Sequence, residues 1–199
     1  STVLVTSLAA CTPKETTKTP EATGVENENT PFTVNYLGQE YSFDKKVENI
    51  VLASLEGMED AAALGVKAVG VLEVAGEVPK YLEEDFKDAT LVGDKMKPNA
   101  EVILGLDPDV IIGTSKFSEE IMAQLNKIAV TLPYSHISAN WKDNLLALGE
   151  IADKKDEANK LISDYEEKAS KAKVFCFILP AFHRLNRPNL LYTGAKNGI

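Results

Sequence analysis

Apolar runs and segments of helical periodicity alternate along most of the chain. Four runs are apolar at nearly every position, as in strands that are buried on both faces: residues 49–53, 68–72, 109–112 and 128–132. Helical signals lie between them, at residues 58–64, 99–104 and 118–127, and the first two of these segments end at Gly65 and Gly105. Strands of this kind, separated by helices, are typical of a parallel sheet covered by helices on both sides. The pattern therefore predicts an α/β fold with a Rossmann-like lobe.

Two further segments flank this alternation. Residues 32–43 alternate apolar and polar side chains around Leu37 and Gly38, which predicts a short β-hairpin. After a further helix at residues 143–151, residues 155–173 carry apolar side chains at steps of three and four, which form one stripe along a long helix: Ala158, Leu161, Ile162, Tyr165, Ala169 and Ala172. We expect that helix to pack along one side and to face water on the other.

The first thirty residues have a different character. Residues 1–10 are weakly apolar, end in small residues and run directly into Cys11, as in the second half of an export signal. Leu8-Ala9-Ala10-Cys11 resembles the bacterial lipobox, and the alternative is a chance apolar stretch before a buried cysteine. Residues 12–30 are rich in Thr, Glu, Lys and Pro, which predicts a disordered tether. We therefore predict a partial signal peptide at residues 1–11, lipidation of Cys11, and a lipid anchor at the extracytoplasmic face of the cell membrane.

Composition narrows the functional classes. The 199 residues carry 21 Lys and Arg against 30 Asp and Glu, a formal net charge of −9, so we do not expect a nucleic-acid-binding surface. The sequence contains none of the motifs GxGxxG, GxxxxGK(S/T), HExxH and GxSxG, which disfavours nucleotide and acyl-transfer chemistry. Two histidines and two cysteines are too few for a multi-histidine or cysteine metal site. We predict no enzymatic activity, no catalytic residue and no resident metal.

Candidate ligand contacts lie beyond the carboxyl ends of the predicted strands, where open parallel sheets bind their ligands. Lys95, Lys97 and Lys116 fall in loops at this edge and would attract an anionic small ligand, although surface loops carry lysines in any protein. Tyr134 could stack on a ligand or close the edge of the sheet. His136 is the fifth candidate, and its alternative is a solvated loop residue.

Six stretches of the sequence carry a resemblance when they are taken together: Val47-Glu-Asn-Ile-Val-Leu52, Ala63-Leu-Gly-Val-Lys-Ala-Val-Gly70, Leu91-Val-Gly93, Pro98-Asn99-Ala-Glu101-Val-Ile103, Leu106-Asp-Pro-Asp-Val-Ile-Ile112 and Gln124-Leu-Asn-Lys-Ile-Ala129. They resemble the amino-terminal lobe of the iron-siderophore substrate-binding lipoproteins of ABC importers, whose two lobes are joined by one long helix. The resemblance extends over residues 32–173. The lipobox and the tether agree with Gram-positive members of that family.

Two features depart from the family pattern. Ala100 follows Pro98-Asn99 where the family usually has Leu. A second lobe is expected after the long helix, and its first strand would be residues 174–180, but residues 181–199 do not resemble α/β structure. The resemblance thus divides the chain into an amino-terminal lobe at residues 31–153, an interlobe helix at 154–173 and a truncated or aberrant start of a second lobe at 174–199.

The resemblance implies binding and delivery. Such proteins trap a ferric chelate between their lobes and hand it to the permease of an ABC importer. The anionic groups of a ferric siderophore would then face Lys95, Lys97 and Lys116, with no covalently bound cofactor. Glu101 occupies the position of a glutamate that pairs with permease arginines, and as an acid in the first turn of a helix it also favours the helix dipole. Haem or cobalamin binding on the same scaffold is the main alternative, and a lone flavodoxin-like signalling or enzymatic domain is a weaker one.

Overall fold

The computed structural model describes residues 30–185, with side chains as far as Ala172. The predictions for the signal segment, for Cys11 and for the tether as far as residue 29 lie outside the described residues. The same applies to the expectation for residues 186–199.

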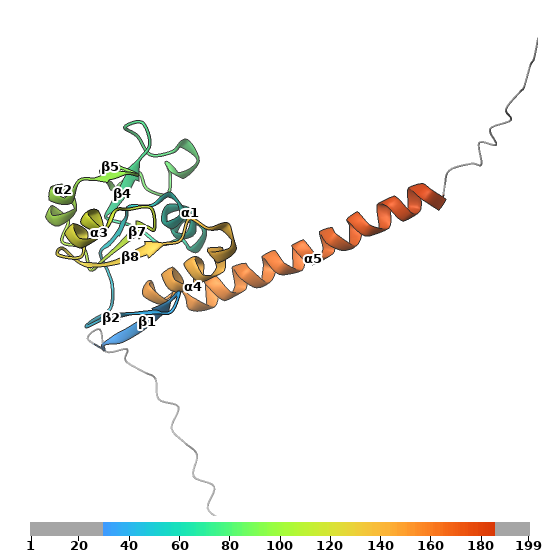
Figure 1. Cartoon of the computed structure of the whole chain (residues 1–199), viewed down its shortest axis with the longest axis horizontal. Helices are drawn as coiled ribbons and strands as arrows, with labels where there is room; N and C mark the ends of the chain where they lie inside the picture. The colour runs from blue at the N-terminus through green and yellow to red at the C-terminus, as the bar shows by residue number, and fades with distance from the viewer. Residues whose placement is uncertain (1–29, 186–199) are drawn as a thin grey trace, which may run out of the picture.

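A six-stranded sheet forms the centre of the lobe (Figure 1). Its strands are β3 (Ile50–Leu52), β4 (Gly70–Glu73), β5 (Thr90–Asp94), β6 (Lys97–Pro98), β7 (Val110–Thr114) and β8 (Val130–Tyr134). They follow the order β6-β5-β4-β3-β7-β8, and every neighbouring pair is parallel except β5 with β6. The α/β prediction is confirmed, and the short antiparallel β6 is an edge strand that the apolar pattern did not indicate.

Helices cover both faces of the sheet. Helices α1 (Leu55–Leu64) and α4 (Trp141–Ile151) and the start of α5 (Lys155–Leu185) share one core cluster, whereas α2 (Ala100–Gly105) and α3 (Glu119–Leu125) share the other. Ile50 and Leu52 belong to the first cluster and Val51 between them belongs to the second, because successive side chains of a strand point to opposite faces. Two short 3-10 helices, η1 (Lys80–Leu82) and η2 (Ser138–Asn140), lie in the connections.

Side-chain caps explain where the predicted helices begin. The side chains of Ser54, Asn99 and Ser118 each accept a backbone N–H from the first turn of α1, α2 and α3. Gly65 ends α1 with a φ of 66°, a left-handed conformation that glycine adopts without a steric penalty.

The predicted hairpin consists of β1 (Phe32–Tyr36) and β2 (Gln39–Phe43) and forms a separate two-stranded sheet. Leu37 and Gly38 both have positive φ angles, 48° and 83°, as a two-residue hairpin turn requires. Its apolar face is buried, and Tyr36 stacks on Tyr134 of β8 with ring centroids 5.7 Å apart. The hairpin is therefore an integral part of the core beside α4.

Helix α5 extends well past the boundary that the sequence predicted. Its first turns pack on α4, where the rings of Trp141 and Tyr165 meet edge to face at 4.8 Å, and the rest projects away from the lobe (Figure 1). The backbone of residues 174–180 continues this helix, so the predicted strand at these positions is wrong. A short apolar run fits a buried strand and a helix equally well by periodicity alone, which is why the pattern misassigned it. In the part of the chain that the structure describes, no helix combines the length and apolarity of a membrane span.

Candidate functional site

Five connections leave the strands at the carboxyl edge of the parallel sheet. They are the entry into α1 after β3, the connection from β4 through η1 to β5, the turn between β5 and β6, the loop between β7 and α3, and the loop between β8 and α4. Because the strands are parallel, all of these connections lie at the same edge. The candidate residues of the sequence analysis lie in the last three of them or directly beside them.

Lys95 and Lys97 lie at the turn between β5 and β6. Gly93 has a φ of 101°, and a Cβ there would come within 2.7 Å of the Lys97 carbonyl oxygen, so the chain can turn back this tightly only with glycine at this position. The Asp94 side chain accepts the Met96 backbone N–H at 3.0 Å and fixes the turn. Both lysines are exposed on it.

Lys116 lies in the loop between β7 and α3. This loop is a tight turn in which the Phe117 N–H donates to the Thr114 carbonyl oxygen at 3.0 Å, and the Phe117 side chain anchors it in the core. Lys116 itself is exposed. Since β5 and β7 are separated by β4 and β3, the two groups of lysines are three strand spacings apart, roughly 14 Å.

None of these three amino groups has an ion pair or hydrogen bond among the residues whose side chains are described. By contrast, Lys154, Lys160 and Lys171 pair with carboxylates along α5. Other exposed lysines, such as Lys127, also make no ion pair, so the lack of a partner alone does not mark a site. The distinguishing feature of Lys95, Lys97 and Lys116 is their common position at the ligand-binding edge.

His136 lies beside Lys116 at this edge. Its Nδ1 atom is 2.8 Å from the Ser115 Oγ atom, and its backbone N–H donates to the same oxygen at 3.2 Å. The ring is therefore tied to the loop between β7 and α3 and is exposed. The structure thus ties His136 to Ser115, the residue before Lys116, and places Lys95 and Lys97 farther along the edge.

Tyr134 has no surface with which to contact a ligand. It is completely buried, and its hydroxyl donates to the Asn144 carbonyl oxygen at 2.5 Å. Burial raises the pKa of this phenol well above its usual value. The prediction of a ligand contact at Tyr134 is wrong, and its alternative is correct, because the residue ends β8 at the edge of the sheet and packs in the core.

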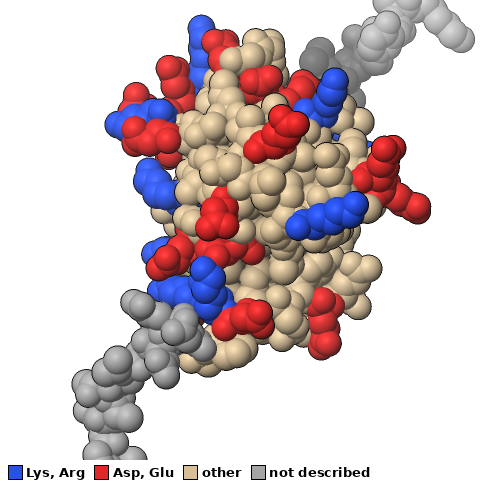
Figure 2. All heavy atoms as spheres, turned by 90° about the vertical axis from the view of Figure 1, so that its left-hand side faces the viewer, with Lys and Arg blue, Asp and Glu red and all other residues tan. Residues whose placement is uncertain are grey.

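Glu101 is exposed in the first turn of α2, where its backbone N–H donates to the Asn99 side chain at 3.1 Å. This position agrees with an acid that favours the helix dipole and leaves the carboxylate accessible. Charged side chains of both signs are interspersed over the face of the lobe that carries α2 and α3, without a continuous basic band (Figure 2).

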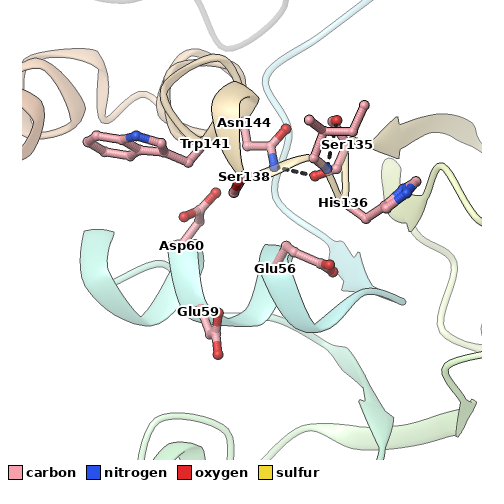
Figure 3. A pocket seen from close by; sticks show the side chains of 9 residues that line it. Glu56, Glu59, Asp60, Ser135, His136, Ser138, Trp141 and Asn144 are labelled. Atoms are coloured by element: carbon pink, nitrogen blue, oxygen red, sulfur yellow. Dashed lines mark hydrogen bonds between the residues drawn. The ribbon is translucent and has the colours of Figure 1, made fainter.

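An acidic hollow of about 120 Å³ lies between α1 and the loop that carries His136 (Figure 3). Glu56, Glu59 and Asp60 line it from α1, and Trp141 and Asn144 line it from α4. The Tyr81 hydroxyl donates to Glu59 at 2.7 Å, whereas no hydrogen bond or ion pair reaches the Asp60 carboxylate within residues 30–172. Burial, together with the charges of Glu59 and Glu56, raises the pKa of Asp60 to about 7.

This hollow was not predicted from the sequence, although a signal was present. Glu56, Glu59 and Asp60 are spaced at three and four residues, which places them on one side of a helix. Among the described residues, no group of three His, Cys, Asp or Glu side chains is arranged to hold a metal ion. The hollow therefore places three carboxyl groups close to His136.

Comparisons with known proteins identify relatives of this lobe. The model of the family described as "Periplasmic binding protein" matches residues 50–174, a range that includes every candidate ligand residue and Glu101. The chain is 34% identical to the "Iron-uptake system-binding protein" of Bacillus subtilis over 172 residues, which cover 86% of this chain and 54% of the relative. It is 33% identical to the "Probable siderophore-binding lipoprotein YfiY" of the same organism, over 83% of this chain and 51% of the relative.

A solved structure agrees with these sequence matches. The triscatecholate siderophore-binding protein FeuA of Bacillus subtilis, complexed with ferri-bacillibactin, superposes with a TM-score of 0.69 at 35% identity, over 72% of this chain and 51% of FeuA. The chain thus spans about half the length of the curated relatives that it matches.

Proposed function

The chain belongs to the periplasmic binding protein family, and from this premise we propose that it binds an anionic ferric siderophore and delivers it to the permease of an ABC importer. The relatives described above are named for iron uptake, siderophore binding or a ferric triscatecholate ligand. Those names favour a ferric siderophore over haem or cobalamin for this chain. They also favour a binding role over enzymatic activity.

The observation that carries the proposal is the cationic edge, which we define as Lys95, Lys97 and Lys116. In a protein of net charge −9, these three amino groups lie at the ligand-binding edge of the sheet without a carboxylate partner in the described residues. An ammonium group that is not already neutralised by a carboxylate is available to a ligand anion. Their separation along the edge suits a broad ligand that carries several negative charges.

His136 supports the proposal as a neighbouring polar contact. Its ring is exposed beside Lys116 and is oriented by Ser115. A ligand that contacts Lys116 would lie within reach of this ring. The buried Tyr134 has no part in the proposed site.

Delivery and anchoring are proposed on separate grounds. Glu101 is an exposed carboxylate at the start of α2, which makes it available to an arginine of a permease. The lipobox-like segment before Cys11, together with a relative named as a lipoprotein, supports lipidation at Cys11 and attachment to the outer face of the membrane. Mass spectrometry of the mature amino terminus tests the anchor, and an unmodified Cys11 contradicts it.

Titration with ferri-bacillibactin tests the binding proposal. Trp141 is the one tryptophan of the sequence and lies at the hollow beside His136, so its fluorescence reports on this edge. We expect saturable quenching of the Trp141 fluorescence. The affinity for the ferric siderophore should fall as the salt concentration rises from 0.02 to 0.5 M, because screening weakens attraction between exposed charges. The same titration with haem and with cobalamin provides the competing arms. Saturable binding of either of these ligands without binding of the ferric siderophore would refute the proposal.

A further inference from the structure

We propose that Tyr36 and Asn144 are positioning residues that hold the loop of residues 135–138, and with it the His136 ring, at the ligand-binding edge. The amino-terminal hairpin would then belong to the binding site as well as to the core. The inference rests on the proposed function, because it assigns a purpose to the orientation of His136. It is carried by the hydrogen bonds at the end of β8.

Ser135 is held from both sides at the point where the chain leaves the sheet. Its backbone N–H donates to the Tyr36 hydroxyl oxygen at 2.6 Å, and its carbonyl oxygen accepts from the Asn144 Nδ2 atom at 2.9 Å. The Tyr36 hydroxyl in turn donates to the Asn144 Oδ1 atom at 2.7 Å. Tyr36 and Asn144 thus act as one pair that satisfies both backbone groups of Ser135, as a neighbouring strand would.

This pair is buried and fully satisfied. Tyr36, Ser135 and Asn144 are at most 5% exposed, and no buried side-chain nitrogen or oxygen atom of the described residues lacks a partner. The residues come from β1, the end of β8 and α4, and the two contacts of Tyr36 span 99 and 108 residues of sequence. A satisfied polar network in the interior specifies one arrangement, since any displacement leaves costly unpaired groups.

The constraint passes from Ser135 to the residues that follow it. The Ser135 Oγ atom accepts from the Ile137 N–H at 3.2 Å and from the Asn140 side chain at 3.0 Å, which fixes the turn into η2. His136 lies between these anchors and meets Ser115 across the edge. The labelled side chains in Figure 3 show His136 and Asn144 on the two sides of Ser135.

The contacts of Ser115 permit one form of the His136 ring that suits ligand binding. The Ser115 Oγ atom accepts the His136 backbone N–H, and its own hydrogen can be donated to the Nδ1 atom. We assign this arrangement, in which a neutral ring carries its proton on Nε2 as a donor that faces away from Ser115. A donor in this position suits the anionic oxygen of a ligand.

Tyr134 provides the contrast that separates positioning from stability. Tyr134 is at least as buried as Tyr36, and its hydroxyl also bonds to Asn144, but to the backbone carbonyl oxygen and not to the side chain that holds Ser135. Removing the Tyr36 hydroxyl leaves the Asn144 Oδ1 atom and the Ser135 N–H without this partner, whereas the Asn144 carbonyl oxygen lies inside α4 and keeps its intrahelical partner, the Leu148 N–H. Only the loss of the Tyr36 hydroxyl releases Ser135.

We therefore compare Tyr36→Phe with Tyr134→Phe in the full 199-residue chain. The first readout is NMR of the ligand-free protein: the ¹⁵N signals of the His136 ring and hydrogen exchange at the His136 and Ile137 amides, which neither substitution touches directly. For Tyr36→Phe we expect a mixture of His136 ring tautomers. We also expect hydrogen exchange to be roughly 5- to 30-fold faster at both amides, which corresponds to a loss of about 1–2 kcal/mol in the free energy of local opening. For Tyr134→Phe we expect a smaller loss of stability, a single Nε2–H tautomer and unchanged exchange relative to the global rate.

The second readout is the affinity for ferri-bacillibactin. We expect Tyr36→Phe to weaken it about 3- to 10-fold, because fewer molecules present the loop in its binding conformation, and Tyr134→Phe to leave it unchanged. Equal effects of the two variants on exchange and tautomer would overturn the inference, as would an Nδ1–H ring in the unmodified protein. That last measurement applies even if Tyr36→Phe does not fold. A chain that shows the expected NMR contrast but binds no ferric siderophore would refute the proposed function and leave the positioning role intact.

Discussion

Replacing Asp60 by asparagine should stabilise the protein at neutral pH. Asp60 lines the acidic hollow beside Glu56 and Glu59, and its carboxylate has no hydrogen-bonding or ionic partner within residues 30–172. Its pKa is raised from 3.8 to about 7, chiefly because burial disfavours the charged form. Between about pH 4 and pH 7, the folded protein therefore keeps a proton on Asp60 that the unfolded chain has already released.

The sign and size of the effect follow from this difference. Between pH 4 and pH 7 the folded state binds more protons than the unfolded state, so the free energy of unfolding falls as the pH rises, and it levels off above pH 7. A rise of about three pKa units corresponds to at most ~4 kcal/mol, and partial exposure of the side chain reduces this to about 2–3 kcal/mol. Asp60→Asn removes the charge with little change in shape, so it should recover this free energy above pH 7 and change little at pH 4.

Urea unfolding followed by circular dichroism at pH 4.5, 6 and 7.5 measures the effect. The unmodified protein should lose stability across this series, whereas Asp60→Asn should show a flatter profile. Asp88→Asn is the matched control, because Asp88 is exposed and makes no hydrogen bond or ion pair among the described residues, and its profile should follow that of the unmodified protein. The reasoning fails if Asp60→Asn is less stable than the unmodified protein at pH 7.5, or if its profile keeps the original slope.

Three further substitutions test the framework of the lobe, each by its urea midpoint. Gly93→Ala should destabilise the protein by about 1–3 kcal/mol, because the positive φ and the Lys97 carbonyl oxygen exclude a Cβ at the β5–β6 turn. Gly105→Ala is the control and should not destabilise the protein in this way, because a Cβ at Gly105 meets open space. Leu148→Ala should cost ~2–5 kcal/mol, since the side chain is completely buried under the sheet, and a loss below 1 kcal/mol would contradict that packing. Burial opposes ionisation of Asp109, but the N–H groups of Asn49 and Glu48 and the ammonium of Lys45 outweigh burial and lower the pKa of this carboxyl. The carboxylate therefore contributes stability above pH 4 that is lost as the pH falls. Asp109→Asn should reduce the part of the stability that acid removes, and an unchanged acid profile would contradict this role of Asp109.

Much of the fold could be predicted because its signals are local. Strands β3, β4, β7 and β8 and helices α1 to α4 follow apolar runs, capping residues such as Ser54 and Ser118, and a terminating glycine at Gly65. The course of residues 174–180 could not be predicted, because an apolar run without periodicity suits a strand and a helix alike.

The site was predictable only as far as topology determines it. Lys95, Lys97, Lys116 and His136 lie at the predicted edge because parallel strands share their carboxyl ends. Whether a residue just before that edge faces solvent or the core depends on tertiary packing, and Tyr134 is buried because the hairpin covers it. The role of Tyr36 had no local signal at all, since its partners lie about one hundred residues away.

The most direct test of the central claim is a titration of the unmodified protein and of a triple variant with ferri-bacillibactin at several salt concentrations. The variant carries Lys95→Gln, Lys97→Gln and Lys116→Gln, and a control carries the same change at Lys67, Lys127 and Lys168, which are exposed and make no ion pair in the described residues. Each exposed charge contributes ~0–1 kcal/mol, so loss of all three should weaken binding roughly 10- to 100-fold and reduce its salt dependence, while the control should keep most of its affinity. Equal affinities and equal salt dependence of the two triple variants would contradict the assignment of the cationic edge as the ligand site.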